Sequence, residues 1–90
     1  MTRDDVNRAA QVRRDGRVQE AAEKLRAILD SPLITQVGRV EAYMELGKAY
    51  DRLGRRRDAQ ACFRRILALT DDVRYRQEAR KLYRKAFRGE

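Results

Sequence analysis

The chain has 90 residues and a mass of 10.6 kDa, the size of one small domain built from few elements. Hydrophobic residues make up 42% and charged residues 40%, which is too apolar for a disordered tail and too charged for a membrane protein. The net charge is +8, and residues 73–90 hold seven basic and two acidic side chains, so this end is expected to attract an anionic partner.

The N-terminal part of the sequence predicts two helices joined by a glycine turn. The first helix is expected to follow Thr2 and to end before Gly16. The second is expected from Arg17 to about Leu29, where apolar residues recur at steps of three and four, the spacing of one helix face. Pro32 ends this pattern, because proline cannot extend a helix.

Two further helices are predicted in the middle of the chain, over about residues 39–53 and about residues 56–69. Gly54 lies between them and is expected to close the third helix in the left-handed conformation. The stretch 33–38 is ambiguous, because a cap at Ser31 would start the third helix earlier.

The last helix is expected over about residues 73–87. Its apolar face is formed by Ala79, Leu82, Tyr83 and Ala86. Arginine recurs every four residues on another face, at Arg76, Arg80, Arg84 and Arg88, with Lys81 and Lys85 beside this row. Like charges at this spacing repel one another by a few tenths of a kcal/mol per pair. The row therefore indicates either an anionic partner or a repulsion that the fold simply tolerates.

An internal repeat relates the two halves of the chain. A shift of 38 residues brings six identical positions together within a stretch of fourteen. The identical pairs are Gly16 and Gly54, Arg17 and Arg55, Ala21 and Ala59, Arg26 and Arg64, Ile28 and Ile66, and Leu29 and Leu67. The sequence therefore predicts two similar helix hairpins followed by one further helix.

The apolar residues of the second hairpin are spaced as Tyr43-x2-Leu46-Gly47-x2-Tyr50, then Leu53-Gly54, then Ala59-x3-Phe63. This pattern resembles the tetratricopeptide repeat. The resemblance implies an all-α fold, a right-handed solenoid of two helix hairpins plus a C-terminal capping helix, in a single domain over residues 1–90. Its units would be about residues 3–31 and about residues 38–71, and the capping helix would be about residues 73–87.

The signature residues themselves are expected to be core and turn residues. Gly47 and Ala59 are small, which suits a close crossing of the two helices of one hairpin. Tyr50 and Phe63 are expected to fill the space between neighbouring hairpins. None of these residues is predicted to contact a partner.

The resemblance instead implies a concave groove lined by the first helix of each unit, with function at the non-signature positions. The residues expected to bind a partner there are Arg13, Glu41, Met44, Glu45, Lys48, Arg52, Arg80 and Arg84. Met44 would supply adaptable apolar contact, and the basic side chains would form charge-assisted bonds with carboxylates. The groove, the basic tail and the convex face remain open as the binding surface, as does the register of the last helix.

The sequence predicts a non-enzymatic protein-protein interaction module, of an adaptor, scaffold or co-chaperone-like type, that binds an acidic protein segment. The carboxylate clamp that some chaperone-binding repeats use is not expected, because the matching positions hold Val6, Ala10 and Glu45. The alternative is nucleic-acid or anionic-surface binding by the basic C-terminal helix. Both a monomer and a homodimer through the C-terminal end are compatible with this pattern.

Absent residue types restrict the chemistry. The sequence has no histidine, which excludes histidine-based acid-base catalysis and histidine-containing metal sites. Its one cysteine, Cys62, forms no internal disulfide and no thiolate metal cluster, and a single thiol fits a reducing compartment. We therefore expect no cofactor, no metal and no catalysis, and a cytoplasmic protein without a membrane span.

Overall fold

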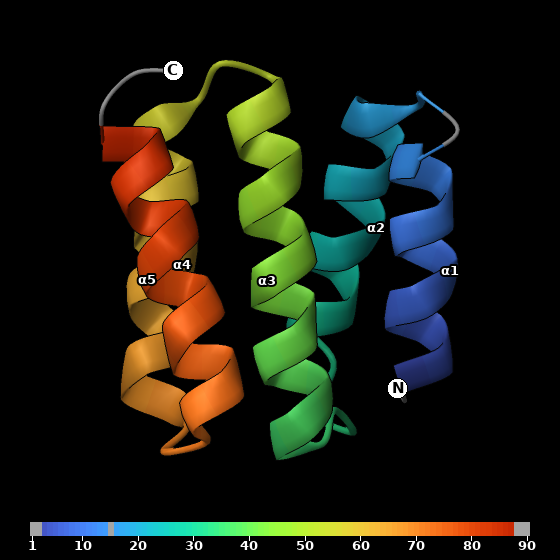
Figure 1. Cartoon of the computed structure of the whole chain (residues 1–90). Coiled ribbons are helices and arrows are strands. Elements are labelled where there is room, and N and C mark those ends of the chain that lie inside the picture. Colours follow the sequence, from blue (N-terminus) through green and yellow to red (C-terminus); the bar gives the residue numbers. More distant parts are fainter. Residues whose placement is uncertain (1–2, 15, 88–90) are drawn as a thin grey trace.

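The computed structural model describes residues 3–14 and 16–87. These residues form an all-α fold of five helices without a strand (Figure 1). The helices are α1 (Arg3–Arg14), α2 (Val18–Leu29), α3 (Gln36–Arg52), α4 (Arg56–Leu69) and α5 (Val73–Phe87). Consecutive helices run in opposite directions, so α3 and α5 end on the same side of the molecule. None of the described helices is both long enough and apolar enough to cross a membrane.

Helix α3 lies at the centre of the fold. It packs against each of the other four helices, whereas the described residues of α1 and α2 make no packing contact with α4 or α5. Figure 1 shows this order, with α1 at one edge, α3 in the middle and α5 in front of α4 at the other edge. The buried residues of α3 are Gly38, Val40, Ala42, Met44, Leu46, Gly47, Ala49 and Tyr50. Helix α3 therefore lies between the α1–α2 pair and the α4–α5 pair.

Gly47 of α3 lies directly against the ring of Phe63 on α4. A Cβ atom at Gly47 would lie 2.4 Å from Cε1 and 2.7 Å from Cζ of this ring. Phe63 is only 1% exposed, so its ring is enclosed by other core residues and has little room to move. The contact confirms the sequence-based expectation that Gly47 is small because α3 and α4 cross closely.

The turns inside the two hairpins depend on glycine, as the repeat predicts. Gly16 and Gly54 have φ angles of 90° and 76°, a region that residues with a side chain rarely adopt. After α3, the amide of Gly54 donates to the carbonyl of Asp51 at 3.1 Å, and the amide of Arg55 donates to that of Tyr50 at 2.9 Å. This pair of bonds is the Schellman motif, which satisfies carbonyls at the end of a helix.

The start of α3 differs from the sequence-based expectation of about residue 39. The Oγ1 atom of Thr35 accepts a hydrogen bond from the amide of Gly38 at 2.9 Å, so Thr35 caps the helix and α3 begins at Gln36. Ser31, which the sequence offered as an earlier cap, accepts from the amide of Leu33 at 3.2 Å within the loop. The longer helix adds one turn to the surface that α3 presents to its neighbours.

Side chains from two other helices satisfy the C-terminal carbonyls of α4. The side-chain Nε2 of Gln36 in α3 donates a hydrogen bond to the backbone carbonyl of Leu69. Arg76 of α5 donates through Nη1 to the carbonyls of Leu67 at 2.6 Å and Thr70 at 3.1 Å. The sequence grouped Arg76 with Arg80, Arg84 and Arg88 in one row along the helix, and in the structure the Arg76 guanidinium completes the end of α4.

Asp72 begins α5. Its Oδ1 atom accepts from the amide of Arg74 at 2.9 Å, and its Oδ2 atom lies 3.1 Å from Nη2 of the same residue. The side chain of Arg74 and then its backbone amide hold the pKa of Asp72 below the usual value. Asp72 thereby serves as the N-cap of α5.

Cys62 is a core residue. It is 5% exposed, and burial raises the pKa of its thiol to about 12, with a smaller contribution from the carboxylate of Asp58. The thiol is therefore neutral and poorly nucleophilic at physiological pH.

Replacing Gly47 with alanine is expected to destabilise the protein by about 1–2 kcal/mol, although alanine favours helix by about 1 kcal/mol over glycine. The physical reason is overpacking against the Phe63 ring, and urea unfolding followed by circular dichroism measures it. The matched test is Gly47→Ala in a Phe63→Leu background, where the space vacated by the ring should remove most of the loss. An equal loss in both backgrounds would contradict this explanation.

Cys62 in the folded protein is expected to react with iodoacetamide at pH 8 at least about 100-fold more slowly than in concentrated urea, because the native thiolate is scarce. The raised pKa also makes stability depend on pH. Between the ordinary value of 9.0 and about 12, the folded state keeps a proton that the unfolded state loses. As the pH rises above 9, the free energy of unfolding of the native protein should therefore fall relative to that of Cys62→Ala. Equal alkylation rates in the folded and unfolded states would contradict the burial of the thiol.

Candidate functional site

Five of the sequence-predicted partner residues lie on α3, which places them at the centre of the molecule. Four of them reach the surface: Glu41, Glu45, Lys48 and Arg52. Met44 does not, since it is 7% exposed and packs within the core cluster. We therefore remove Met44 from the residues that we propose to contact a partner.

Both carboxylates on this surface of α3 already have partners. Oε1 of Glu41 accepts a hydrogen bond from the Tyr75 hydroxyl of α5 at 2.7 Å. Oε1 of Glu45 lies 3.6 Å from Nζ of Lys48, and these two side chains are 15% and 31% exposed. Glu41 and Glu45 are thus engaged within the fold, and the bond of Glu41 ties α5 to α3.

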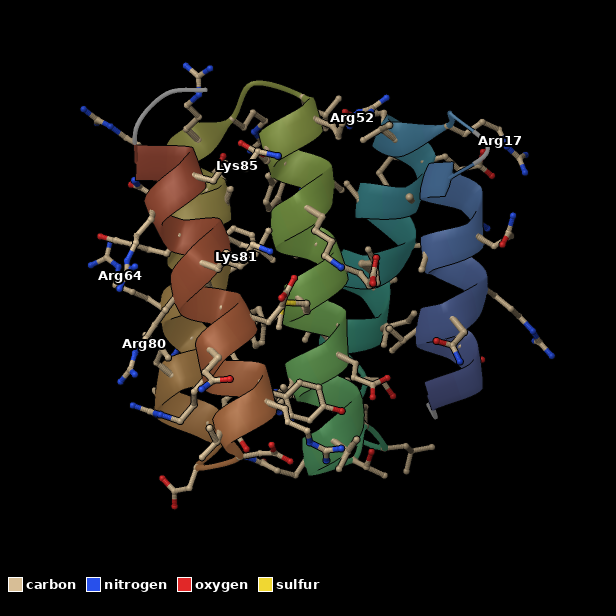
Figure 2. The ribbon with its side chains drawn as sticks, in the orientation of Figure 1. Arg17, Arg52, Arg64, Arg80, Lys81 and Lys85 are labelled. Atoms are coloured by element: carbon tan, nitrogen blue, oxygen red, sulfur yellow. The ribbon has the colours of Figure 1, made fainter. Side chains whose placement is uncertain are left out.

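Basic side chains without ion-pair partners gather where α3 and α5 end. Figure 2 shows Arg52 at the end of α3, and Lys81 and Lys85 along α5 on the side turned toward the viewer. All three are exposed, and none forms an ion pair in the described part of the chain. We call the surface formed by Glu41, Glu45, Lys48 and Arg52 of α3 with Lys81 and Lys85 of α5 the front face. Arg52 and Lys85 lie toward one end of this face, whereas the exposed carboxylate of Glu78, three residues before Lys81, shares that side of α5 nearer its start.

Two predicted residues of α5 lie elsewhere. Figure 2 shows Arg80 on the outer side of α5, pointing away from α3, in the same direction as Arg64 of α4. Arg84 is exposed and follows Arg80 by four residues, so it shares that side of the helix. The predicted partner residues therefore do not line one surface.

Two positions of the first helix that match the carboxylate clamp are buried. Val6 and Ala10 are each 1% exposed and belong to the core, in agreement with the expectation that they form no carboxylate clamp. The side chains of Arg13 and Arg88, which the sequence also proposed, lie outside the described part of the structure.

The sequence-predicted partner set missed Lys85 and Tyr75. The signal for their side of α5 was partly present, since Ala79, Leu82 and Ala86 define the apolar face of the helix. Which border of that face turns toward α3 is decided by how α5 packs on α3 and α4. A pattern along one helix does not contain that information.

A separate hollow of about 460 Å³ lies on the hairpin of α3 and α4. Its lining residues are Tyr43 of α3 and Ala61, Cys62, Arg64 and Arg65 of α4. No carboxylate of the described residues lines it. Among the described residues, no three acidic or cysteine side chains come close enough together to hold a metal ion.

Comparison with known families agrees with this architecture. Residues 40–73 match the model of the tetratricopeptide repeat family, from the first half of α3 through α4 to the first residue of α5. Neither a comparison with curated proteins nor one with solved structures finds a significant match. The family match confirms the resemblance seen in the sequence, and tetratricopeptide repeats are in general protein-protein interaction modules. The chain therefore carries a tetratricopeptide repeat, formed by α3 and α4.

Proposed function

We propose that this protein is a non-enzymatic interaction module that binds an acidic protein segment along the front face. The single observation that carries the proposal is the division of charge on that face. Its two carboxylates are engaged by Tyr75 and Lys48, whereas Arg52, Lys81 and Lys85 have no ion-pair partner in the described part of the chain.

The positions of the free cations also give the bound segment a direction. Helices α3 and α5 end on the same side, so Arg52 and Lys85 lie toward one end of the front face (Figure 2). Acidic residues of the ligand would lie at that end. The bond between Glu41 and Tyr75 lies in the opposite half, nearer the starts of α3 and α5, where a neutral part of the segment would meet fewer free charges.

The choice of basic residues suits carboxylate recognition. The guanidinium of Arg52 can donate two parallel hydrogen bonds to one carboxylate, and the two lysine ammonium groups add compact positive charges beside it. Charge-assisted bonds of this kind contribute about 1.5–3 kcal/mol each when they are shielded from water.

Reversing the charge of Arg52 and Lys85 together is expected to weaken binding of the acidic partner at least about tenfold, which is about 1.4 kcal/mol. Arg52→Glu with Lys85→Glu is preferable to a change at Lys48, because loss of Lys48 would also release Glu45. The measurement is quantitative mass spectrometry of proteins captured from the native host by the full chain, followed by titration of the captured segment.

The matched control is Arg8→Glu with Arg26→Glu, which makes the same change of charge on two exposed residues of α1 and α2 that form no ion pair in the described part of the chain. This variant should retain the partners that the native chain captures, and circular dichroism should show equal helix content in all three proteins. Equal capture by the Arg52 and Lys85 variant would refute the front face as the binding surface.

A further inference from the structure

The outer side of the α4 and α5 pair carries arginines from both helices. We call this surface the arginine edge and define it by Arg57 and Arg64 of α4 and Arg80 and Arg84 of α5. All four side chains are exposed, and none of them forms an ion pair in the part of the chain that the structure describes. The edge lies on the side of α5 opposite to Tyr75, whose hydroxyl bonds to Glu41 of α3.

The two helices bring these arginines onto one continuous surface. The guanidinium carbon of Arg64 lies 6.0 Å from the ring centroid of Tyr83, which links the outer side of α4 to that of α5. Figure 2 shows Arg64 and Arg80 extending in the same direction. Arg57 precedes Arg64 by two helical turns, so both occupy one face of α4.

This part of the chain holds nearly all of the net charge. Residues 55–87 contain eleven basic and four acidic side chains, a net charge of +7 out of +8 for the whole sequence. Two of the four carboxylates pair with arginines outside the edge, Asp58 with Arg55 at 2.8 Å and Asp72 with Arg74 at 3.1 Å. Neighbouring arginines one turn apart repel each other, and a bound anion would relieve that repulsion.

We propose that the arginine edge binds the phosphate backbone of a nucleic acid. A guanidinium pairs with a phosphate through two parallel hydrogen bonds, and such contacts give affinity that does not depend on sequence. Two rows of arginines on adjacent antiparallel helices present several such groups to one stretch of backbone. The proposal does not rest on the front face, since none of the four arginines belongs to it.

Other occupants fit the edge less well. A second copy related by twofold symmetry would place the same positive surface against itself. A bilayer needs an apolar helix side to insert, but Ala79 and Ala86 of α5 are 0% and 2% exposed. An interface with a folded protein, unlike the acidic segment proposed for the front face, is usually centred on large apolar anchors, and in the described part of α4 and α5 the one large exposed apolar side chain is Val73. Backbone phosphates require no such anchor.

The test is a titration of a fluorescent mixed-sequence duplex of about 20 base pairs with the full chain, between about 50 and 200 mM salt. Each neutralised phosphate contributes about −0.9 to the slope of log affinity against log salt concentration. The native chain should therefore give a slope of about −3 to −4 if its four edge arginines are engaged. Arg64→Gln with Arg80→Gln should bring the slope closer to zero by about 2 and weaken binding at least about tenfold at the lowest salt.

Two control variants separate the edge from net charge alone. Arg8→Gln with Arg26→Gln removes the same charge from exposed residues of α1 and α2, which make no packing contact with α4 or α5. This variant should keep the native slope and bind within about twofold of the native chain. Arg64→Lys with Arg80→Lys should also keep the slope, because the charges remain, while losing part of the affinity that paired hydrogen bonds supply.

Several results would overturn the proposal. One is the absence of binding to the duplex, or to a single-stranded RNA of similar length, at the lowest salt. Another is an equal loss of affinity in Arg64→Gln with Arg80→Gln and in the control Arg8→Gln with Arg26→Gln. That result would show that binding depends on net charge alone. A third is tighter binding of polyglutamate or of anionic phospholipid vesicles than of nucleic acid through the same arginines.

Discussion

The approach of Phe63 to the bare backbone at Gly47 sets the spacing of α3 and α4, and the remaining packing depends on that spacing. Helix α3 is the common neighbour of all the other helices, so its position relative to α4 determines where α5 docks. Gln36 and Arg76 then reach the end of α4 from α3 and α5. Together with the bond from Tyr75 to Glu41, these contacts lock three helices into one unit. Its surface charges therefore have fixed relative positions.

Helix α5 distributes its charges over two separate surfaces because its packing fixes its rotation. Ala79 and Ala86 face the core, and the side chains on either border of that stripe are turned in opposite directions. Lys85 consequently lies on the side of α5 that faces the viewer in Figure 2, whereas Arg80 extends in the same direction as Arg64 of α4. Helix α5 thus contributes lysines to the front face, where Glu41 and Glu45 are bound within the fold. It contributes arginines to the arginine edge.

Local spacing was sufficient to predict the helices and the glycine turns, because apolar periodicity and the positive φ of Gly16 and Gly54 are properties of short segments. The start of α3 was missed because Pro32 and Thr35 both suit the beginning of a helix, and the bond from the Gly38 amide decides between them. The role of Arg76 was missed for a different reason. Its partners are carbonyls six and nine residues earlier in the chain, which come within reach only after α5 folds against α4.

The two basic surfaces share one electrostatic potential even though they contact different neighbours. They meet along α5, because Lys81 of the front face and Arg84 of the arginine edge are three residues apart, about 5–6 Å between Cβ atoms, which is within the Debye length at physiological salt. An anion bound to one surface therefore lowers the positive potential at the other, and linkage requires that the effect be reciprocal. Because the separation is shorter than the screening length, this antagonism is strongest in dilute buffer and persists at physiological salt. Anionic ligands on the two proposed surfaces are therefore expected to weaken each other's binding.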